Sequence, residues 1–170
     1  WPTMRPAQRG RILAAMADEL TRRRDELIEL NIAEAGSTRM LAEMLQVGTP
    51  IDHFCDLTNR VLPQFDFEPP VRPVMGHGIG QGMVLREPYG VAALITPFNF
   101  PFLLNLAKVG PALAAGCTAV LKPSPYTPLE ALVLGEIAET AGLPPGVLNV
   151  ITGDIAEGEA LTTHTGVDLV

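Results

Sequence analysis

The stretch Val91–Pro128, VAALITPFNFPFLLNLAKVGPALAAGCTAVLKPSPYTP, decides the fold of this chain. It begins with the short apolar run Val91–Ile95, which is typical of a strand covered on both faces. Thr96-Pro97 ends that strand, because proline cannot donate to a ladder and disfavours a helical conformation in the residue before it. Phe102–Ala115 is apolar nearly all round, which predicts a helix packed on several sides. Cys117–Leu121 predicts a second strand.

Two polar residues follow these strands. Asn99 lies in the turn after the first strand, and Lys122 directly follows the second. Ligands bind outside the carboxyl ends of the strands in open parallel sheets. Either residue alone would be explained as part of a turn or as a solvated strand end. Together they predict a ligand site at one edge of the sheet.

The alternation of strand and helix continues to the end of the chain. Val147–Ile151 predicts a third strand, Glu157–Thr163 a short helix and Val167–Val170 the start of a fourth strand. Strands that alternate with helices through short loops predict a right-handed parallel sheet in an α/β fold.

The helix before the third strand has a strong start signal. Thr127-Pro128-Leu129-Glu130 matches a capping box with proline at the first helical position. The apolar spacing predicts an inner face of Leu129, Leu132, Val133 and Ile137.

The N-terminal part predicts two amphipathic helices. The first runs from about Arg5 to Ile32, and the second, capped by Ser37, continues to about Leu62. Met40 and Met44 fall on the apolar stripe of the second helix, so we expect them in the core. Residues 63–73 are rich in proline and acidic side chains and predict a connector. The alternating glycines of residues 76–82 lack the G-x-G-x-x-G spacing and favour a protruding β-ribbon that needs a partner to pair with.

Composition excludes several classes of protein. The 170 residues are 47% hydrophobic and carry a net charge of −7, which argues against a nucleic-acid partner. Pro88–Ala107 is uncharged over 20 residues, but its prolines and asparagines argue against a membrane span. The start of the sequence does not match a signal peptide. We therefore expect a protein without membrane attachment.

The cysteines and histidines show no ligand pattern. Cys55 and Cys117 are a single unpatterned pair, which favours a reduced, cytoplasmic setting. His53, His77 and His164 have no ligand-like spacing, so we expect no metal.

The sequence resembles the aldehyde dehydrogenase superfamily. The matching blocks occur in order, and they are EPYGV at 87–91, ITPFNFP at 95–101, PALAAGC at 111–117, LKPS at 121–124 and PPGVLNVITG at 144–153. The resemblance implies a Rossmann-like fold that corresponds to the early part of the coenzyme-binding domain, truncated before the catalytic cysteine. We therefore expect a single partial domain over residues 1–170. Its parts are N-terminal helices over 1–62, a connector and oligomerisation-type ribbon over 63–89, and a βαβαβαβ coenzyme-binding part over 90–170.

The resemblance also implies chemistry and residue roles. Members of the superfamily oxidise an aldehyde to a carboxylic acid through a cysteine thioester, with NAD or NADP as coenzyme, and we expect a homo-oligomer. Asn99 would donate a hydrogen bond to the oxyanion, a role in which one donor contributes about 10²–10³ in rate. The coenzyme would contact the backbone of the first strand exit, a lysine, a serine and a glycine, namely Ile95, Thr96, Pro97, Phe98, Lys122, Ser124 and Gly153.

Two features depart from the superfamily pattern. Pro125 stands where NAD-preferring members have a glutamate that would repel a 2′-phosphate, so both NAD and NADP remain open. Ile155 stands where a small residue is commoner.

The nucleophile and general base of the superfamily are not found in these residues. Cys117 starts a buried strand, an apolar setting in which a thiol is inert, and Cys55 has no activating neighbour in the sequence. No Gly-x-Ser-x-Gly motif offers another nucleophile. We therefore expect the isolated chain to be inactive. Two alternatives stay open, a non-catalytic nucleotide-binding or assembly module and a fragment of a CoA-acylating or semialdehyde-reducing relative.

Overall fold

The computed structural model describes residues 1–76 and 78–170. His77, which the sequence places in the ribbon and among the histidines considered as metal ligands, lies outside the described residues. The strands are β1 (Val74–Met75), β2 (Ile79–Gly80), β3 (Val91–Ile95), β4 (Thr118–Lys122) and β5 (Leu148–Val150). The helices are α1 (Pro6–Arg22), α2 (Arg24–Ala35), α3 (Arg39–Leu41), the π-helical η1 (Ala42–Gln46), α4 (Gly48–Asp56), the π-helical η2 (Leu57–Val61), α5 (Leu62–Gln64), α6 (Pro101–Ala115), α7 (Leu129–Thr140) and α8 (Ile155–Thr163).

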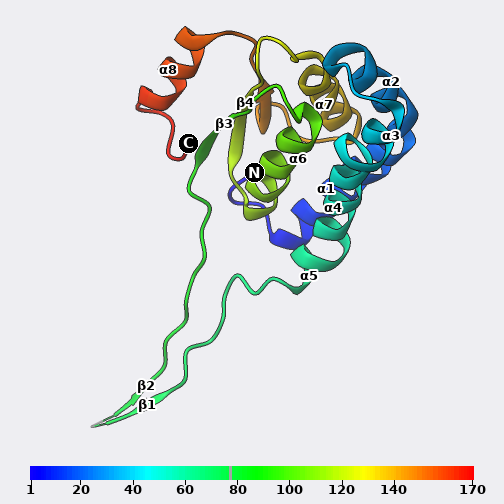
Figure 1. The fold of residues 1–170 in the computed structure, drawn as a ribbon. Helices are drawn as coiled ribbons and strands as arrows, with labels where there is room; N and C mark the ends of the chain where they lie inside the picture. Colours follow the sequence, from blue (N-terminus) through cyan, green and yellow to red (C-terminus); the bar gives the residue numbers. More distant parts are fainter. Residues whose placement is uncertain (77) are drawn as a thin grey trace.

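The centre of the fold is a parallel sheet with the strand order β3-β4-β5. Its register places Val91 opposite Thr118 and Ile95 opposite Lys122. Figure 1 shows α6 and α7 on one side of this sheet and α8 on the other. The α/β class with a parallel, Rossmann-like sheet is therefore confirmed.

The predicted fourth strand is wrong in extent. Residues 167–170 form a single parallel bridge between Leu169 and Ala92. The Asp168 carboxylate accepts a hydrogen bond from the Val91 backbone N–H at 2.8 Å. The Asp168 side chain thus occupies the backbone N–H at the start of β3, and the pairing between β3 and residues 167–170 stays limited to one bridge.

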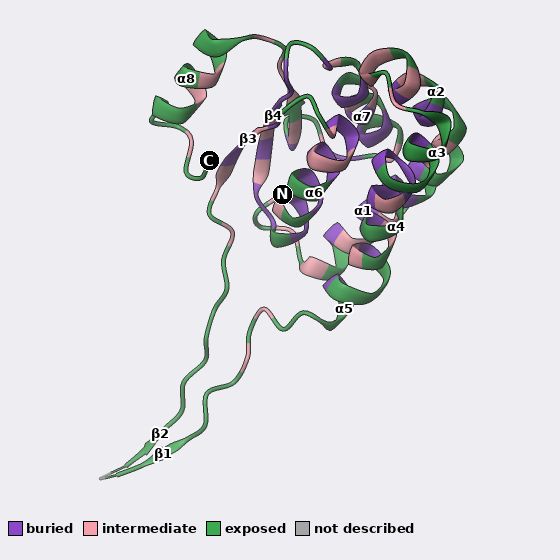
Figure 2. Ribbon diagram, in the orientation of Figure 1, coloured by how far each residue is buried: buried purple, intermediate pink, exposed green. Residues whose placement is uncertain are grey.

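The segment from β3 to β4 follows the sequence pattern closely. Pro101 is the first residue of α6, where its missing N–H costs nothing, and Gly116 ends the helix at φ 103°. Phe102, Val109 and Leu113 are fully buried between the sheet and the N-terminal helices. Figure 2 shows that the buried residues concentrate where α6, α7, α1 and α4 meet.

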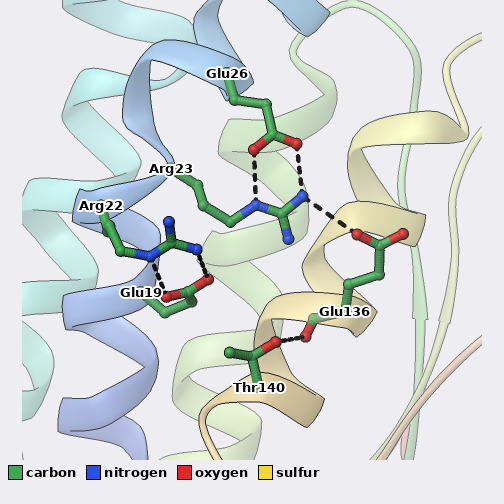
Figure 3. Close-up of polar contacts among 6 residues, drawn as sticks. All are labelled: Glu19, Arg22, Arg23, Glu26, Glu136 and Thr140. Atoms are coloured by element: carbon green, nitrogen blue, oxygen red, sulfur yellow. Dashed lines mark hydrogen bonds and ion pairs between the residues drawn. The ribbon is translucent and has the colours of Figure 1, made fainter.

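The first predicted helix is interrupted at Arg23, which separates α1 from α2 at φ −93° and ψ 11°. Figure 3 shows the Arg23 guanidinium between two carboxylates. Its Nη2 lies 2.6 Å from Glu26 Oε1 and 3.2 Å from Glu136 Oε2. The Arg23 side chain at the break therefore links the N-terminal helices to α7, which contacts β5.

Two expectations for the second helical segment are wrong. Thr38, rather than Ser37, caps it, with the Thr38 hydroxyl accepting from the Leu41 backbone N–H at 3.3 Å. Met40 and Met44 are 70% and 69% exposed, so neither belongs to the core. The π-helical turn η1 accounts for this, because its i→i+5 hydrogen bonds break the regular apolar stripe; Met44 lies within this turn, and Met40 lies two residues before it.

The start of α7 also differs from the prediction. The capping box is not formed, because the Glu34 carboxylate from α2 accepts the backbone N–H groups of Leu129 and Glu130 at 2.6 and 3.3 Å. The helix is rotated so that Glu130 points inward, and Leu129 and Leu132 are exposed. The buried apolar face consists of Ala131, Leu134, Ile137 and Ala138.

Residues 67–76 and 78–86 run away from the body as two antiparallel segments, and Figure 1 shows them as an extended arm. Backbone hydrogen bonds pair Val71 with Gly82, Val84 with Pro69 and Arg86 with Phe67. Large apolar side chains on the arm are exposed, among them Val74, Met75, Ile79 and Met83. Across the part of the chain that the structure describes, no helix has both the length and the apolar character needed to cross a bilayer.

Candidate functional site

The carboxyl ends of β3 and β4 meet at one edge of the sheet. Ile95 lies opposite Lys122, and the Thr96 backbone N–H continues the ladder by donating to the Lys122 carbonyl oxygen at 3.1 Å. Pro97, Phe98 and Asn99 then form the turn before α6, and all three are exposed. The structure therefore brings the Asn99 turn and Lys122 to the same edge, because a parallel register aligns consecutive strand ends.

Lys122 joins this edge to the turn after β5. Its side chain is only 5% exposed, and Nζ donates to the carbonyl oxygens of Pro123 at 3.0 Å and Gly153 at 2.8 Å. An ammonium group has three N–H donors, so one is left for a further acceptor. A Cβ at residue 153 would lie 2.4 Å from Glu157 Cγ, so a larger residue there would displace the Glu157 side chain.

The loops after β3 and β4 contact each other through aromatic rings. Phe98 and Tyr126 pack edge to face with ring centroids 5.8 Å apart, and both side chains are exposed. Ser124, in the same loop as Tyr126, is buried, with Oγ accepting from the Tyr126 backbone N–H at 3.2 Å. The Ser124 O–H remains able to donate. Ile95, Thr96, Pro97, Phe98, Lys122, Ser124 and Gly153 thus lie at or beside one edge of the sheet.

Glu157 supplies a negative charge beside Lys122. Its carboxylate accepts the Asp154 backbone N–H at 2.7 Å and forms part of the capping box that begins α8. Backbone hydrogen bonds lower the pKa of Glu157, and the nearby Lys122 charge lowers it further. Glu157 is therefore ionised at neutral pH and partly balances the Lys122 ammonium.

Buried polar side chains contact the Asn99 turn from the interior of the fold, and the sequence analysis did not include them among the site residues. The Thr96 hydroxyl donates to Asn105 Oδ1 at 2.7 Å, and Gln46 Nε2 donates to the Asn99 carbonyl oxygen at 3.1 Å. Asn105 and Gln46 are 0% and 2% exposed. A signal for Asn105 was visible, because it is an uncharged polar residue within an apolar helix. Gln46 carried none, since its partner is 53 residues away.

A buried carboxyl group lies near the start of α6. Glu130 is fully buried, and Asn31 Nδ2 donates to its two oxygens at 3.1 and 3.3 Å. Burial raises the pKa of Glu130 to about 8, the Asn31 and Phe102 hydrogen bonds oppose that rise, and the Glu34 charge adds to it. Glu130 is thus largely protonated at neutral pH.

Neither cysteine lies at this edge. Cys117 immediately precedes β4, so it lies at the opposite end of that strand from Lys122, and it is 3% exposed. Cys55 is half-buried on α4, with Sγ 3.9 Å from the Thr21 hydroxyl. Among residues 1–76 and 78–170, the edge therefore combines hydrogen-bond donors and a cation but no thiol.

The donor set fits a nucleotide coenzyme. Sugar hydroxyls and phosphate oxygens accept hydrogen bonds, and the free Lys122 N–H and the Ser124 O–H are suited to them. The exposed turn over Pro97–Asn99 and the Phe98 ring give such a ligand a surface to lie on. The Asn99 side chain is exposed and makes no hydrogen bond with the described residues, so its amide is free to donate to a substrate oxygen.

Comparisons with known proteins agree with this arrangement. The sequence profile described as "Aldehyde dehydrogenase family" matches residues 1–170. The chain is 40% identical to aminoaldehyde dehydrogenase 2 of Pisum sativum, with 100% of this chain and 34% of that protein aligned. It is also 40% identical to phenylacetaldehyde dehydrogenase of Pseudomonas fluorescens, with 96% of this chain and 33% of that protein aligned. The chain thus spans about a third of the length of the curated relatives it matches.

Solved structures give the same result. The fold superposes on an aldehyde dehydrogenase of Mycobacterium tuberculosis complexed with NAD+, with a TM-score of 0.90 and 35% identity over 99% of this chain and 34% of that chain. Aldehyde dehydrogenase C of Pseudomonas syringae, a mutant in complex with NAD+ and octanal, matches with a TM-score of 0.89 and 35% identity over 99% of this chain and 33% of that chain.

Proposed function

Since the chain belongs to the aldehyde dehydrogenase family, we propose that it is the coenzyme-binding portion of an enzyme that oxidises an aldehyde to a carboxylic acid. The observation that carries this proposal is the shared edge of β3 and β4, where the Asn99 turn and Lys122 meet. NAD or NADP, when bound, would supply the acceptor for the hydride that leaves the substrate.

Asn99 is proposed as the oxyanion donor. Its exposed amide is uncharged, so it stabilises negative charge on a carbonyl oxygen without itself changing protonation state. Pro101 and the start of α6 limit the freedom of the turn, which keeps the donor oriented before the substrate arrives.

Lys122, Ser124, Gly153 and the backbone of Ile95–Phe98 are proposed to hold the coenzyme. Lys122 would donate its remaining N–H to a ribose hydroxyl, and the contact of its Nζ with Gly153 keeps the side chain from swinging away. The relatives crystallised with NAD+ support NAD as the coenzyme. Pro125, which presents no carboxylate to a 2′-phosphate, supports NADP as well.

The isolated chain is proposed to bind coenzyme without turnover. Cys117 is too buried to attack a substrate, and Cys55 lies on α4 away from the sheet edge. We also propose that the complete enzyme is a homo-oligomer, supported by the exposed apolar arm. A cytoplasmic location remains part of the proposal and rests on the two free cysteines.

Two measurements test the proposed function. Calorimetric titration of the purified chain with NAD and NADP should detect one site, and Lys122→Met should weaken it. A chimera that joins these residues to the remaining part of the Pisum sativum relative should oxidise aldehydes, and Asn99→Ala should lower its kcat by about 10²–10³-fold. An active chimera with an unchanged kcat in Asn99→Ala would remove Asn99 from the mechanism. Aldehyde oxidation by the unfused chain, abolished by a thiol reagent, would overturn the proposed inactivity.

A further inference from the structure

Within residues 1–76 and 78–170, the Gln46 side chain makes one hydrogen bond, which reaches the turn that carries Asn99. Its Nε2 donates to the Asn99 carbonyl oxygen at 3.1 Å, although 53 residues separate the two in sequence. The side chain is 2% exposed, and its Oε1 has no hydrogen-bond partner within residues 1–76 and 78–170. The Gln46 side-chain amide is therefore buried with only its nitrogen hydrogen-bonded among the described residues.

The backbone around Gln46 has an uncommon conformation that orients this side chain. Gln46 ends the π-helical turn η1, which closes with the Val47 N–H donating to the Ala42 carbonyl oxygen at 3.0 Å. Gly48 permits that turn, because a Cβ there would lie 2.1 Å from the Glu43 carbonyl oxygen. Arg24 Nη2 reaches the same carbonyl oxygen at 3.2 Å. Single π-helical turns of this kind frequently occur at functional sites.

Core stability does not account for a glutamine at this position. A buried amide that leaves one polar atom unpaired loses free energy relative to an apolar side chain of the same size. Asn99 itself is an exposed residue, and the hydrogen bond from Gln46 to its carbonyl oxygen is part-buried. The hydrogen bond from Gln46 restrains the Asn99 turn, and the hydrogen bond between Thr96 and Asn105 restrains the start of the same turn.

We propose that Gln46 is a positioning residue, which holds the Asn99 backbone so that the side-chain amide faces the reacting carbonyl. This inference rests on the proposed function of Asn99 as oxyanion donor. It extends the site from the sheet edge to the N-terminal helical layer, since η1 belongs to that layer and contacts α6. Gln46 acts through Asn99 and does not touch the substrate.

The first test measures the order of the turn in the purified chain. Gln46→Leu keeps the size of the side chain and removes the donor. Backbone 15N relaxation should give an order parameter for Asn99 near the rigid value of about 0.85 in the parent chain and a value below about 0.6 in the variant. Met44→Ala, an exposed residue of the same π-helical turn, is the matched control and should leave the turn ordered. The thermal midpoint should fall in neither variant, because a purely structural role of Gln46 would lower that of Gln46→Leu.

Gln46→Met provides a second variant if the leucine packs poorly. Its unbranched side chain is close to glutamine in length and has no N–H donor, so the same loss of order is expected. An ordered Asn99 turn in both folded variants would overturn the proposal.

The second test is kinetic and uses the chimera described above. Gln46→Leu should lower kcat by roughly 10-fold to 100-fold, because small misplacements of a catalytic group are costly, and it should leave the KM for NAD within about twofold. Asn99→Ala serves as the reference. If Asn99→Ala leaves kcat unchanged, the proposed role of Asn99 as oxyanion donor fails, whatever Gln46 does. If Asn99→Ala lowers kcat while Gln46→Leu does not, the positioning role alone is refuted.

Discussion

The buried Glu130 carboxyl group should make the stability of this chain depend on pH. The pKa of Glu130 is about 8 in the fold, against 4.5 for an exposed glutamate, because burial between α2, α6 and α7 disfavours its charged form. Between these two values the folded chain keeps a proton that the unfolded chain releases. The free energy of unfolding should therefore fall as pH rises through this window, and it should level off above about pH 8.

The size of the effect follows from the same pKa difference. One pKa unit corresponds to about 1.4 kcal/mol, so the interval from 4.5 to about 8 corresponds to roughly 5 kcal/mol as an upper bound. Glu130→Gln should remove this contribution, because an amide does not ionise. The variant should also fit, since its Nε2 can donate to Asn31 Oδ1, which lacks a partner in the described structure.

Urea unfolding followed by circular dichroism at pH 5.5, 7 and 9 measures the difference. The stability advantage of Glu130→Gln over the parent chain should grow by roughly 3–4 kcal/mol between pH 5.5 and pH 9. Glu139→Gln, an exposed position on the same helix, is the control and should keep the parent pH profile. Parallel profiles for Glu130→Gln and the parent chain would refute the reasoning, because the raised pKa could not then come from this carboxyl group.

Other perturbations test the site and its support. Lys122→Met, which removes the charge but keeps a long buried side chain, should weaken NAD binding by about 10-fold or more, because a charge-assisted hydrogen bond is lost; an unchanged calorimetric affinity would exclude Lys122 from the site. Pro125→Glu should lower the affinity for NADP relative to NAD by about 10-fold through like-charge repulsion, and equal weakening of both coenzymes would argue against a nearby 2′-phosphate. Gly90→Ala should destabilise the chain by about 1–3 kcal/mol, since φ is 123° and a Cβ would lie 2.1 Å from Asp168 Oδ2. Gly76→Ala, where a Cβ meets nothing within 4 Å, should leave the urea midpoint unchanged and so serves as the control.

Local patterns predicted the β3–α6–β4 segment well. The apolar runs, Pro101 and Gly116 each restrict the conformation of their own neighbourhood, so no distant residue was needed to read them. The parallel sheet and the common edge of the Asn99 turn and Lys122 followed from the same runs, because short loops between strands and helices leave few topologies. The motifs around them were also sufficient to indicate the family.

Errors arose where a local signal competed with a distant partner. The motif at Thr127–Glu130 predicts a capping box, yet Glu34 of another helix occupies the N-terminus of α7. Glu130 then turns inward to Asn31, and the helix face rotates with it. The fourth strand was overestimated for a similar reason, since the Asp168 side chain takes the Val91 N–H that a longer ladder would use.

The amino-acid sequence by itself determined the order of strands and helices, the parallel sheet and the edge at which Asn99 and Lys122 emerge. These depend on backbone preferences and apolar periodicity, which act over a few residues. Only the tertiary structure decided which polar groups are buried and what they contact, as with Gln46 beneath the Asn99 turn and Glu130 beside Asn31. The first contact joins residues that are 53 positions apart in the sequence, and the second joins residues that are 99 positions apart. Their formation depends on how whole helices pack against one another.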